Sequence, residues 1–281
     1  MTALAPTALS PAEEARAAAV KPRRWGSWYV AEHRIRAIQS YYKTLLFTAV
    51  GSPFMYLFAL GVGLATLVDK NSGGAFSGTS YLAFVAPALI ASAAVTAAVE
   101  ECTYPILMGF KWNAIFYGMN AAPLTGRQIV NGVFLAVIAR ILPTTIIFFL
   151  VMLVFGAVPS PWGFLNIVIA TVTGMSFGVV IASYMATVET DAGQPAFIQR
   201  FIIAPLLLFS GTFFPLTSMP IYLQWIGWIS PLWHGTQLGR DVSFGQVEPG
   251  WLVAVHIAFP LALIAFGWVR TQRVVTRRLN K

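Results

Sequence analysis

Long apolar runs constrain this chain more than any other feature, because each can cross the hydrocarbon of a membrane as a helix. A membrane-spanning helix needs about 20 mainly apolar residues. Hydrophobic residues make up 57% of the 281 residues and charged residues only 10%, against about 25% charged in soluble domains. The sequence therefore predicts an all-α integral membrane protein with six transmembrane helices, at Leu45–Leu67, Tyr81–Val99, Ile129–Phe155, Phe164–Met185, Phe197–Phe214 and Trp251–Val269.

The basic residues gather on one side of the predicted membrane. With both ends of the chain in the cytosol, the cytosolic segments hold 15 of the 18 lysines and arginines, whereas the outer loops hold only Lys70 and Arg240. Lysine and arginine accumulate in cytosolic loops, so we expect both termini to be cytosolic (N-in, C-in). The net charge of +8 then reflects membrane orientation and does not indicate binding to nucleic acid.

The chain on either side of the membrane domain, residues 44–270, is polar or amphipathic. Residues 1–20 lack the apolar core of a secretory signal and are expected to be a flexible cytosolic tail, and residues 271–281 a basic cytosolic tail. In residues 21–43, Trp28, Ile35 and Tyr42 recur every seven residues with arginines around them. This pattern favours an amphipathic helix in the cytosolic interface, in contact with lipid headgroups. The alternative is a basic flank that only orients the first span.

A short amphipathic segment, about 109–121, separates the second and third spans. Its apolar residues follow helical spacing, and they are Trp112, Ile115, Phe116 and Met119, preceded by Lys111. Thr125 and Gln128 then form a capping-box pattern for the third span. Such a helix can transmit force from a soluble partner to the spans, or it can simply float on the lipid surface.

A proline-broken apolar stretch, about 215–245, precedes the last span. Pro215 stops the fifth span, and Pro220 and Pro231 are placed to open two short helices. Two helices too short to cross suggest an outer re-entrant hairpin, which membranes tolerate only where protein or water covers the backbone. Its candidate functional residues are Trp225, Trp228, Trp233, His234 and Arg240. His234 is expected to position polar headgroups or to bond within the hairpin.

Arg140 lies near the middle of the third span. A charge at this depth is costly and usually paired or functional. We expect Arg140 to pair with Glu100 or Glu101, at the inner end of the second span, in either a structural or a gating ion pair; a side chain that snorkels to the interface is the alternative. No metal-ligand or catalytic constellation is present.

Several segments together resemble the type 2 ABC exporter permeases, in particular the nodulation-factor (lipo-chito-oligosaccharide) exporter permeases and the daunorubicin-type drug-efflux permeases. The resemblance covers about residues 25 to 275. The segments that carry it are "SPFMYLFALGVGL" (52–64), "SYLAFVAPALIASAAVTAAVEECTY" (80–104), "APLTGRQIVNG" (122–132) and "APLLLFSGTFFPLTSMP…SPLWHGTQLGR" (204–240). In the last of these, the pair "LFSGTFFPLTSMP" and "PLWH…LGR" is the most specific part.

The resemblance implies a transport subunit of the bacterial plasma membrane that is not itself an enzyme. It implies two ATPase subunits that hold ATP and Mg²⁺, a second permease subunit (a homodimer is favoured), and a coupling role for the segment 109–121. The chain itself has no G-x-x-x-x-G-K-[ST] phosphate loop. The expected substrate is an amphiphile: a glycolipid, a lipid-linked oligosaccharide or a hydrophobic drug. An ion-coupled secondary transporter is the alternative, but it would need buried acids, which the spans nearly lack.

Overall fold

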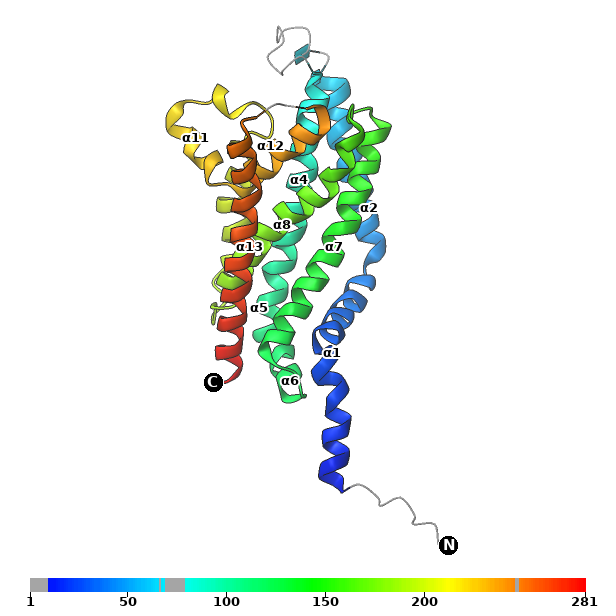
Figure 1. The fold of residues 1–281 in the computed structure, drawn as a ribbon, viewed down its shortest axis with the longest axis vertical. Helices are drawn as coiled ribbons and strands as arrows, with labels where there is room; N and C mark the ends of the chain where they lie inside the picture. The colour runs from blue at the N-terminus through cyan, green and yellow to red at the C-terminus, as the bar shows by residue number, and fades with distance from the viewer. Residues whose placement is uncertain (1–9, 66, 69–78, 246–247) are drawn as a thin grey trace.

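The computed structural model describes residues 10–65, 67–68, 79–245 and 248–281. The outer-loop position predicted for Lys70 lies outside these residues. Within them, every regular element is a helix. The long helices run side by side along one axis, and the first and last of them have their outer chain ends at the same end of the bundle (Figure 1). The fold is thus all-α, as predicted.

Five helical segments in the described residues are long and apolar enough to cross a membrane: Tyr42–Gly61, Tyr81–Phe110, Gly126–Val154, Pro161–Met185 and Gly250–Leu279. The predicted fifth span, Phe197–Phe214, is instead a shorter apolar helix, Gln194–Phe209. It contains a π-helical turn, η3 (Ile198–Ile203), and ends before Gly211, whose φ of 70° breaks the helix. A sixth span of full length is therefore not present in the described chain.

The element bounds refine the predicted ones. The long helices are α1 (Pro11–Gln39), α2 (Tyr42–Phe58), α4 (Tyr81–Cys102), α7 (Gly126–Val154), α8 (Asn166–Met185) and α13 (Gly250–Leu279). The shorter helices are α5 (Tyr104–Phe110), α6 (Ile115–Ala121), α9 (Gln194–Phe197), α10 (Ala204–Phe209), α11 (Ile221–Trp228) and α12 (Pro231–Phe244). A π turn, η1 (Ala59–Leu64), extends α2, and short 3₁₀ turns lie at η2 (Pro161–Leu165) and η4 (Leu216–Ser218).

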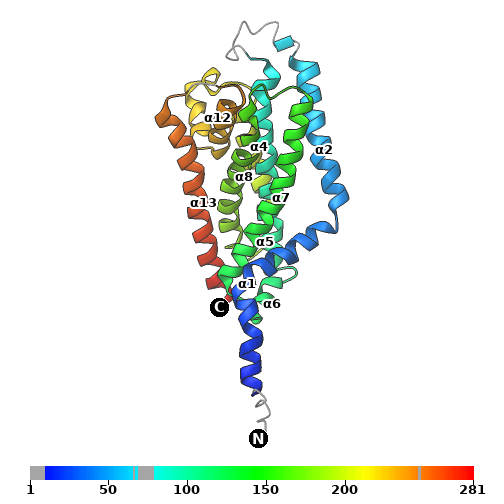
Figure 2. The same ribbon diagram turned by 45° about the vertical axis from the view of Figure 1, so that its right-hand side comes forward.

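Helix α4 forms the centre of the bundle and packs most closely against α8. A Cβ on Gly174 would lie 2.6 Å from the Ala94 carbonyl oxygen, and one on Gly178 would lie 3.1 Å from the Ala98 Cβ. These two glycines, four residues apart, let the helix backbones approach each other. In the most apolar 18-residue stretch of each segment, 78% of the residues are buried in Tyr81–Phe110, against 11% in Tyr42–Gly61. Helix α2 therefore lies at the edge of the subunit (Figure 2).

Helix α1 begins earlier than predicted. Ser10 and Glu13 form a capping box at its start, and residues 11–20 of the predicted tail are helical. The part of that tail before Ser10 lies outside the described residues. The first half of α1 extends beyond the bundle (Figures 1 and 2). The second half packs on α7, where a Cβ on Gly132 would meet Val30 at 2.5 Å. Trp25 and Trp28 point away from this contact and are exposed.

The segment 109–121 was predicted as one helix, and the structure divides it in two. Helix α5 ends at Phe110, Ala114 adopts a left-handed conformation (φ 52°), and α6 starts at Ile115. Lys111 and Trp112 therefore lie in the turn between the two helices. The prediction missed this turn because alanine is not a residue that favours positive φ.

Candidate functional site

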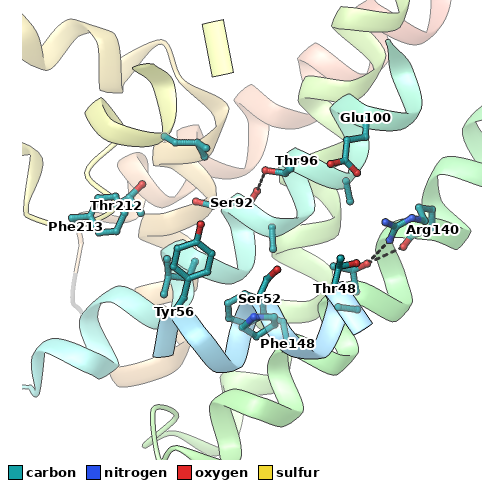
Figure 3. Close-up of a pocket in the computed structure, with 17 residues that line it drawn as sticks. Thr48, Ser52, Tyr56, Ser92, Thr96, Glu100, Arg140, Phe148, Thr212 and Phe213 are labelled. Carbon is teal, nitrogen blue, oxygen red and sulfur yellow. Dashed lines mark hydrogen bonds between the residues drawn. The ribbon is translucent and has the colours of Figure 1, made fainter. Parts of the chain in front are cut away.

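A cavity of about 280 Å³ lies between α2, α4 and α7, with Leu207, Thr212 and Phe213 closing one side. Each of the three helices contributes side chains one turn apart, at i, i+4 and i+8 (Figure 3). This spacing places three residues on one face of a helix. The sets are Thr48, Ser52 and Tyr56 on α2, Ser92, Thr96 and Glu100 on α4, and Arg140, Thr144 and Phe148 on α7. We call this space the hydroxyl cavity.

Several hydroxyl groups of this cavity already donate to their own helix. The Ser92 hydroxyl donates to the Ala88 carbonyl (2.7 Å), the Thr96 hydroxyl to Ser92 (3.0 Å) and the Thr48 hydroxyl to Thr44 (3.1 Å). A hydroxyl that donates keeps lone pairs with which it can accept. The cavity wall therefore presents hydrogen-bond acceptors among apolar groups, and it suits a ligand that carries donors such as sugar hydroxyls or amides.

The ion pair predicted for Arg140 does not form. Arg140 Nη1 donates to the Thr144 hydroxyl at 2.8 Å, whereas Glu101 forms its salt bridge with Arg34 of α1 at 3.2 Å. Glu100 and Arg140 do line the same cavity, on different helices (Figure 3). The prediction missed Arg34 because this residue lies on α1, 67 positions before Glu101 in the sequence.

The predicted outer hairpin consists of two short helices, α11 and α12, as expected from Pro220 and Pro231. They lie at the end of the bundle opposite α6 (Figure 1). Trp225 and Trp228 are about half exposed, whereas the ring of Trp233 packs on His234 and His256. The aromatic residues of the hairpin thus divide into an outward-facing set and an inward-facing one.

A continuous hydrogen-bond network lies beneath this hairpin. His234 Nδ1 and His256 Nδ1 are 2.6 Å apart, and His256 Nε2 lies 2.8 Å from Glu248 Oε2. Gln237 donates to the other oxygen of Glu248 (2.6 Å) and accepts from Arg240 Nη1 (2.8 Å). We call these five residues the outer network. His234 Nε2 also lies 3.0 Å from the Trp228 carbonyl oxygen, a contact within the hairpin that agrees with the second of its two predicted roles.

Arg240 is fully buried in the outer network. Its Nε donates to the Phe84 carbonyl (3.2 Å), its Nη2 donates to the Gly211 carbonyl (2.8 Å), and its guanidinium lies 3.6 Å from the centre of the Phe84 ring. Burial lowers the pKa of Arg240 to about 9, so the side chain is still charged at pH 7. It ties α12 to α4 and to the end of the α10 segment.

Sequence analysis missed His256, Glu248 and Gln237 as partners. His256 stands among apolar residues of the last predicted span, yet in the structure it lies between His234 and Glu248 in the network. The sequence feature that could have predicted the network is His256 itself, because a histidine in an apolar span needs a polar partner. The partners could not be named, since they come from a neighbouring helix and a loop.

The residues predicted for coupling lie at the opposite end of the bundle and differ in exposure. Lys111 and Trp112 are exposed, Ile115 and Met119 are half-buried, and Phe116 is buried against Gly109 and Phe110. Phe116 is thus a core residue that supports the α5–α6 turn. The exposed aromatic surface here also includes Tyr117 and Tyr104, and the Tyr104 ring stacks on Trp112.

Arg278, in the last turn of α13, connects three helices at this end of the molecule. Its Nη1 donates to the Ala186 and Val188 carbonyls at 2.9 and 2.7 Å, and its guanidinium lies 4.1 Å from the centre of the Phe110 ring. The last turn of α13, the end of α8 and α5 are therefore held together beside α6.

The family model for the ABC-2 type transporter matches residues 34–244, most of the chain. The chain belongs to the ABC-2 type transporter family. The match contains the hydroxyl cavity, the α5–α6 turn and most of the outer hairpin. With its several apolar helices, this ABC-2 protein is a multi-pass protein of the bacterial inner membrane.

Curated relatives support the assignment. The chain is 29% identical to Nodulation protein J of Rhizobium leguminosarum bv. viciae, over 83% of this chain and 86% of the relative. It is 26% identical to Nodulation protein J of Sinorhizobium fredii, over 94% and 98%. A shorter match, 32% over 28% of this chain and 20% of the relative, is to a probable multidrug ABC transporter permease of Escherichia coli. No solved structure matches the chain significantly.

Proposed function

We propose that this ABC-2 chain is the permease subunit of an ATP-driven exporter that moves an amphiphile outward across the inner membrane. Family membership over residues 34–244 carries the proposal. The chain lacks a phosphate loop, so ATP and Mg²⁺ would bind to a separate ATPase, in two copies per transporter. The hydroxyl cavity suits the polar part of a glycolipid, a lipid-linked oligosaccharide or a drug.

The proposed membrane arrangement has both termini in the cytosol and Gln194–Phe209, together with the residues after it, as a sixth crossing. The α5–α6 turn then faces the ATPase, and α1 lies in the cytosolic interface with its exposed tryptophans at headgroup level. Helices α11 and α12 form the outer hairpin. Only 11% of the α2 span is buried within the subunit, which leaves its outer face for lipid or for a second copy in a homodimer.

Co-purification from the native membrane tests the ATPase partnership. We expect an ATPase to accompany the wild-type chain and to be lost when Trp112→Ala removes the exposed ring of the α5–α6 turn. Trp162→Ala is the matched control, because Trp162 is also an exposed tryptophan and lies at the other end of the bundle. Phe116 is unsuitable for this test, since its loss would disturb the core.

The proposal fails if no ATPase accompanies the wild type and the reconstituted chain transports on an ion gradient alone. That outcome would favour the ion-coupled secondary transporter. Against that alternative, the five spanning segments contain only two carboxylates, Glu100 and Glu101, at one end of α4.

A further inference from the structure

A second cavity, of about 330 Å³, meets the hydroxyl cavity at Arg140. It lies between the end of α1, the start of α2 and the middle of α7. Its wall is mainly aliphatic, including Ile35, Leu46 and Ile147. Ala49, Arg140 and Thr144 line both cavities. We call the second space the apolar cavity.

Arg140 has unused binding capacity at this junction. Among the residues that the structure describes, no carboxylate lies within ion-pair distance of its guanidinium, and its side chain donates to Thr144 alone. A guanidinium has five N–H donors, so most of them remain for a ligand. Of the two nearby carboxylates, Glu101 is held by Arg34, and Glu100 faces Arg140 across the hydroxyl cavity beyond ion-pair distance.

An unpaired cation within a membrane span is costly unless a ligand or a partner compensates it. Guanidinium groups bind phosphate, sulfate and carboxylate through paired hydrogen bonds. Arg140 is therefore suited to an anionic group at the boundary between a polar and an aliphatic space. The anionic group of the ligand would then lie at the junction between its polar headgroup and its aliphatic chain.

Glu100 restricts the headgroup. It lines only the hydroxyl cavity, on the α4 wall (Figure 3). A carboxylate accepts hydrogen bonds from hydroxyl or amide donors and repels a second anion. Glu100 lies at the same end of the hydroxyl cavity as Arg140, and the hydroxyl groups extend from there toward Ser92 and Tyr56 (Figure 3). The order of chemistry along the site is therefore aliphatic wall, guanidinium facing a carboxylate, and hydroxyl groups.

We propose that Arg140 binds the anionic group of a single-chain amphiphile, with the chain in the apolar cavity and a hydroxylated headgroup in the hydroxyl cavity. The proposal deepens the export function and rests on it for its role in the cell. Binding itself needs neither the ATPase nor ATP. Failure of the ATPase test would thus leave this site intact, and failure here would leave the ATPase test intact.

The test is equilibrium binding to the full chain in nanodiscs of neutral phosphatidylcholine, measured by native mass spectrometry. The probes are dodecyl phosphate, a neutral dodecyl glucoside of equal chain length, inorganic phosphate without a chain, and phosphatidylglycerol with two chains. We expect one dodecyl phosphate per chain, bound about tenfold or more tightly than each other probe.

Arg140→Gln is expected to weaken binding of dodecyl phosphate roughly 10- to 100-fold, the range for a charge-assisted hydrogen bond. Arg140→Lys keeps the charge and is expected to lose less. Arg270→Gln is the matched control, because Arg270 is an exposed arginine on α13 that lines neither cavity. Leu46→Trp, at an exposed position of the apolar cavity, leaves Arg140 in place and is expected to block the chain.

Equal binding of the glucoside would show that the anion is not recognised. Equal binding of phosphatidylglycerol would reduce the site to a contact with bulk lipid, and equal binding of inorganic phosphate would exclude a role for the chain. Each of these results overturns the proposal, as does an Arg270→Gln loss equal to that of Arg140→Gln. If Arg140→Gln does not fold, Leu46→Trp decides, and unchanged binding in that variant overturns the proposal.

Discussion

At the scale of the residue, Arg240 is the most completely buried charge in the described chain. Its planar guanidinium group donates to the Phe84 carbonyl from Nε and to the Gly211 carbonyl from Nη2. A lysine ammonium cannot reproduce that planar geometry, and each hydrogen bond lost from a charged donor costs about 1.5–3 kcal/mol. The side chain therefore holds three segments together through one rigid group.

We predict that Arg240→Lys lowers the free energy of unfolding by about 2–4 kcal/mol. Thermal unfolding followed by tryptophan fluorescence in detergent would measure the change. Arg270→Lys, at an exposed position, should change it by less than about 0.5 kcal/mol. Similar losses in the two variants would show that the hydrogen bonds of Arg240 contribute little.

Two groups of α12 have opposite pH behaviour: His234 in the outer network and Asp241, which follows Arg240 in the chain. Burial, and then repulsion from His256, lower the pKa of His234 to about 4. Burial, and then Glu248, raise the pKa of Asp241 to about 7. Between pH 4 and 6.5 unfolding makes His234 take up a proton and Asp241 release one. The first effect makes stability rise with pH, and the second makes it fall.

We predict that these two contributions to the pH dependence of the free energy of unfolding largely cancel in the wild type. Variants that remove one of the two groups should each show the contribution of the other. Asp241→Asn should leave the His234 contribution, so stability is lost as pH falls from 6.5 to 4. His234→Gln should leave the Asp241 contribution, so stability is lost as pH rises from 4 to 7. Unfolding midpoints across this range would measure both. Parallel slopes in the two variants would contradict the assignment.

At the scale of the element, close contact of α4 and α8 depends on Gly174. A methyl group there would meet the Ala94 backbone at 2.6 Å, and a backbone atom cannot move aside as a flexible side chain can. We predict that Gly174→Ala costs about 1–3 kcal/mol, as overpacking does, measured by the same unfolding assay.

The control is Gly118→Ala in α6. A Cβ at Gly118 meets nothing within 4 Å, so alanine should stabilise the helix by up to about 1 kcal/mol. If both variants were stabilised, the packing of α4 on α8 would be looser than described.

The sequence predicted a helix boundary correctly where that boundary depends on residues only a few positions apart. The Thr125–Gln128 capping box is present, and Pro231 opens α12. The same reasoning failed at Ala114, whose left-handed backbone divides α5 from α6. It also failed for the ion pair of Arg140, because Glu101 is taken by a residue 67 positions away.

At the scale of the whole molecule, the number of crossings is the property that sequence and structure describe differently. Apolar length predicts six, and five described segments meet that length. Gln194–Phe209 has 16 residues, or about 24 Å as an ideal α-helix, which is short of the ~30 Å hydrocarbon core. Whether it crosses decides on which side everything after it lies.

Cysteine labelling tests the proposed sixth crossing. The chain has one cysteine, Cys102, which is buried. Labelling of an introduced cysteine can therefore be measured with little labelling of the native one. We predict that Thr217→Cys reacts with an impermeant maleimide from outside the inner membrane, whereas Asn280→Cys reacts only after lysis. The reverse pattern would mean that Gln194–Phe209 does not cross.

The two π turns lie in segments that border the hydroxyl cavity. η1 continues α2, and η3 leads directly into α10, which contributes Leu207. A π turn holds one residue more than an α turn, so converting one to the other rotates the following chain by about 100°. Conversion of η3 to an α turn would therefore rotate α10 and change how Leu207 faces the hydroxyl cavity.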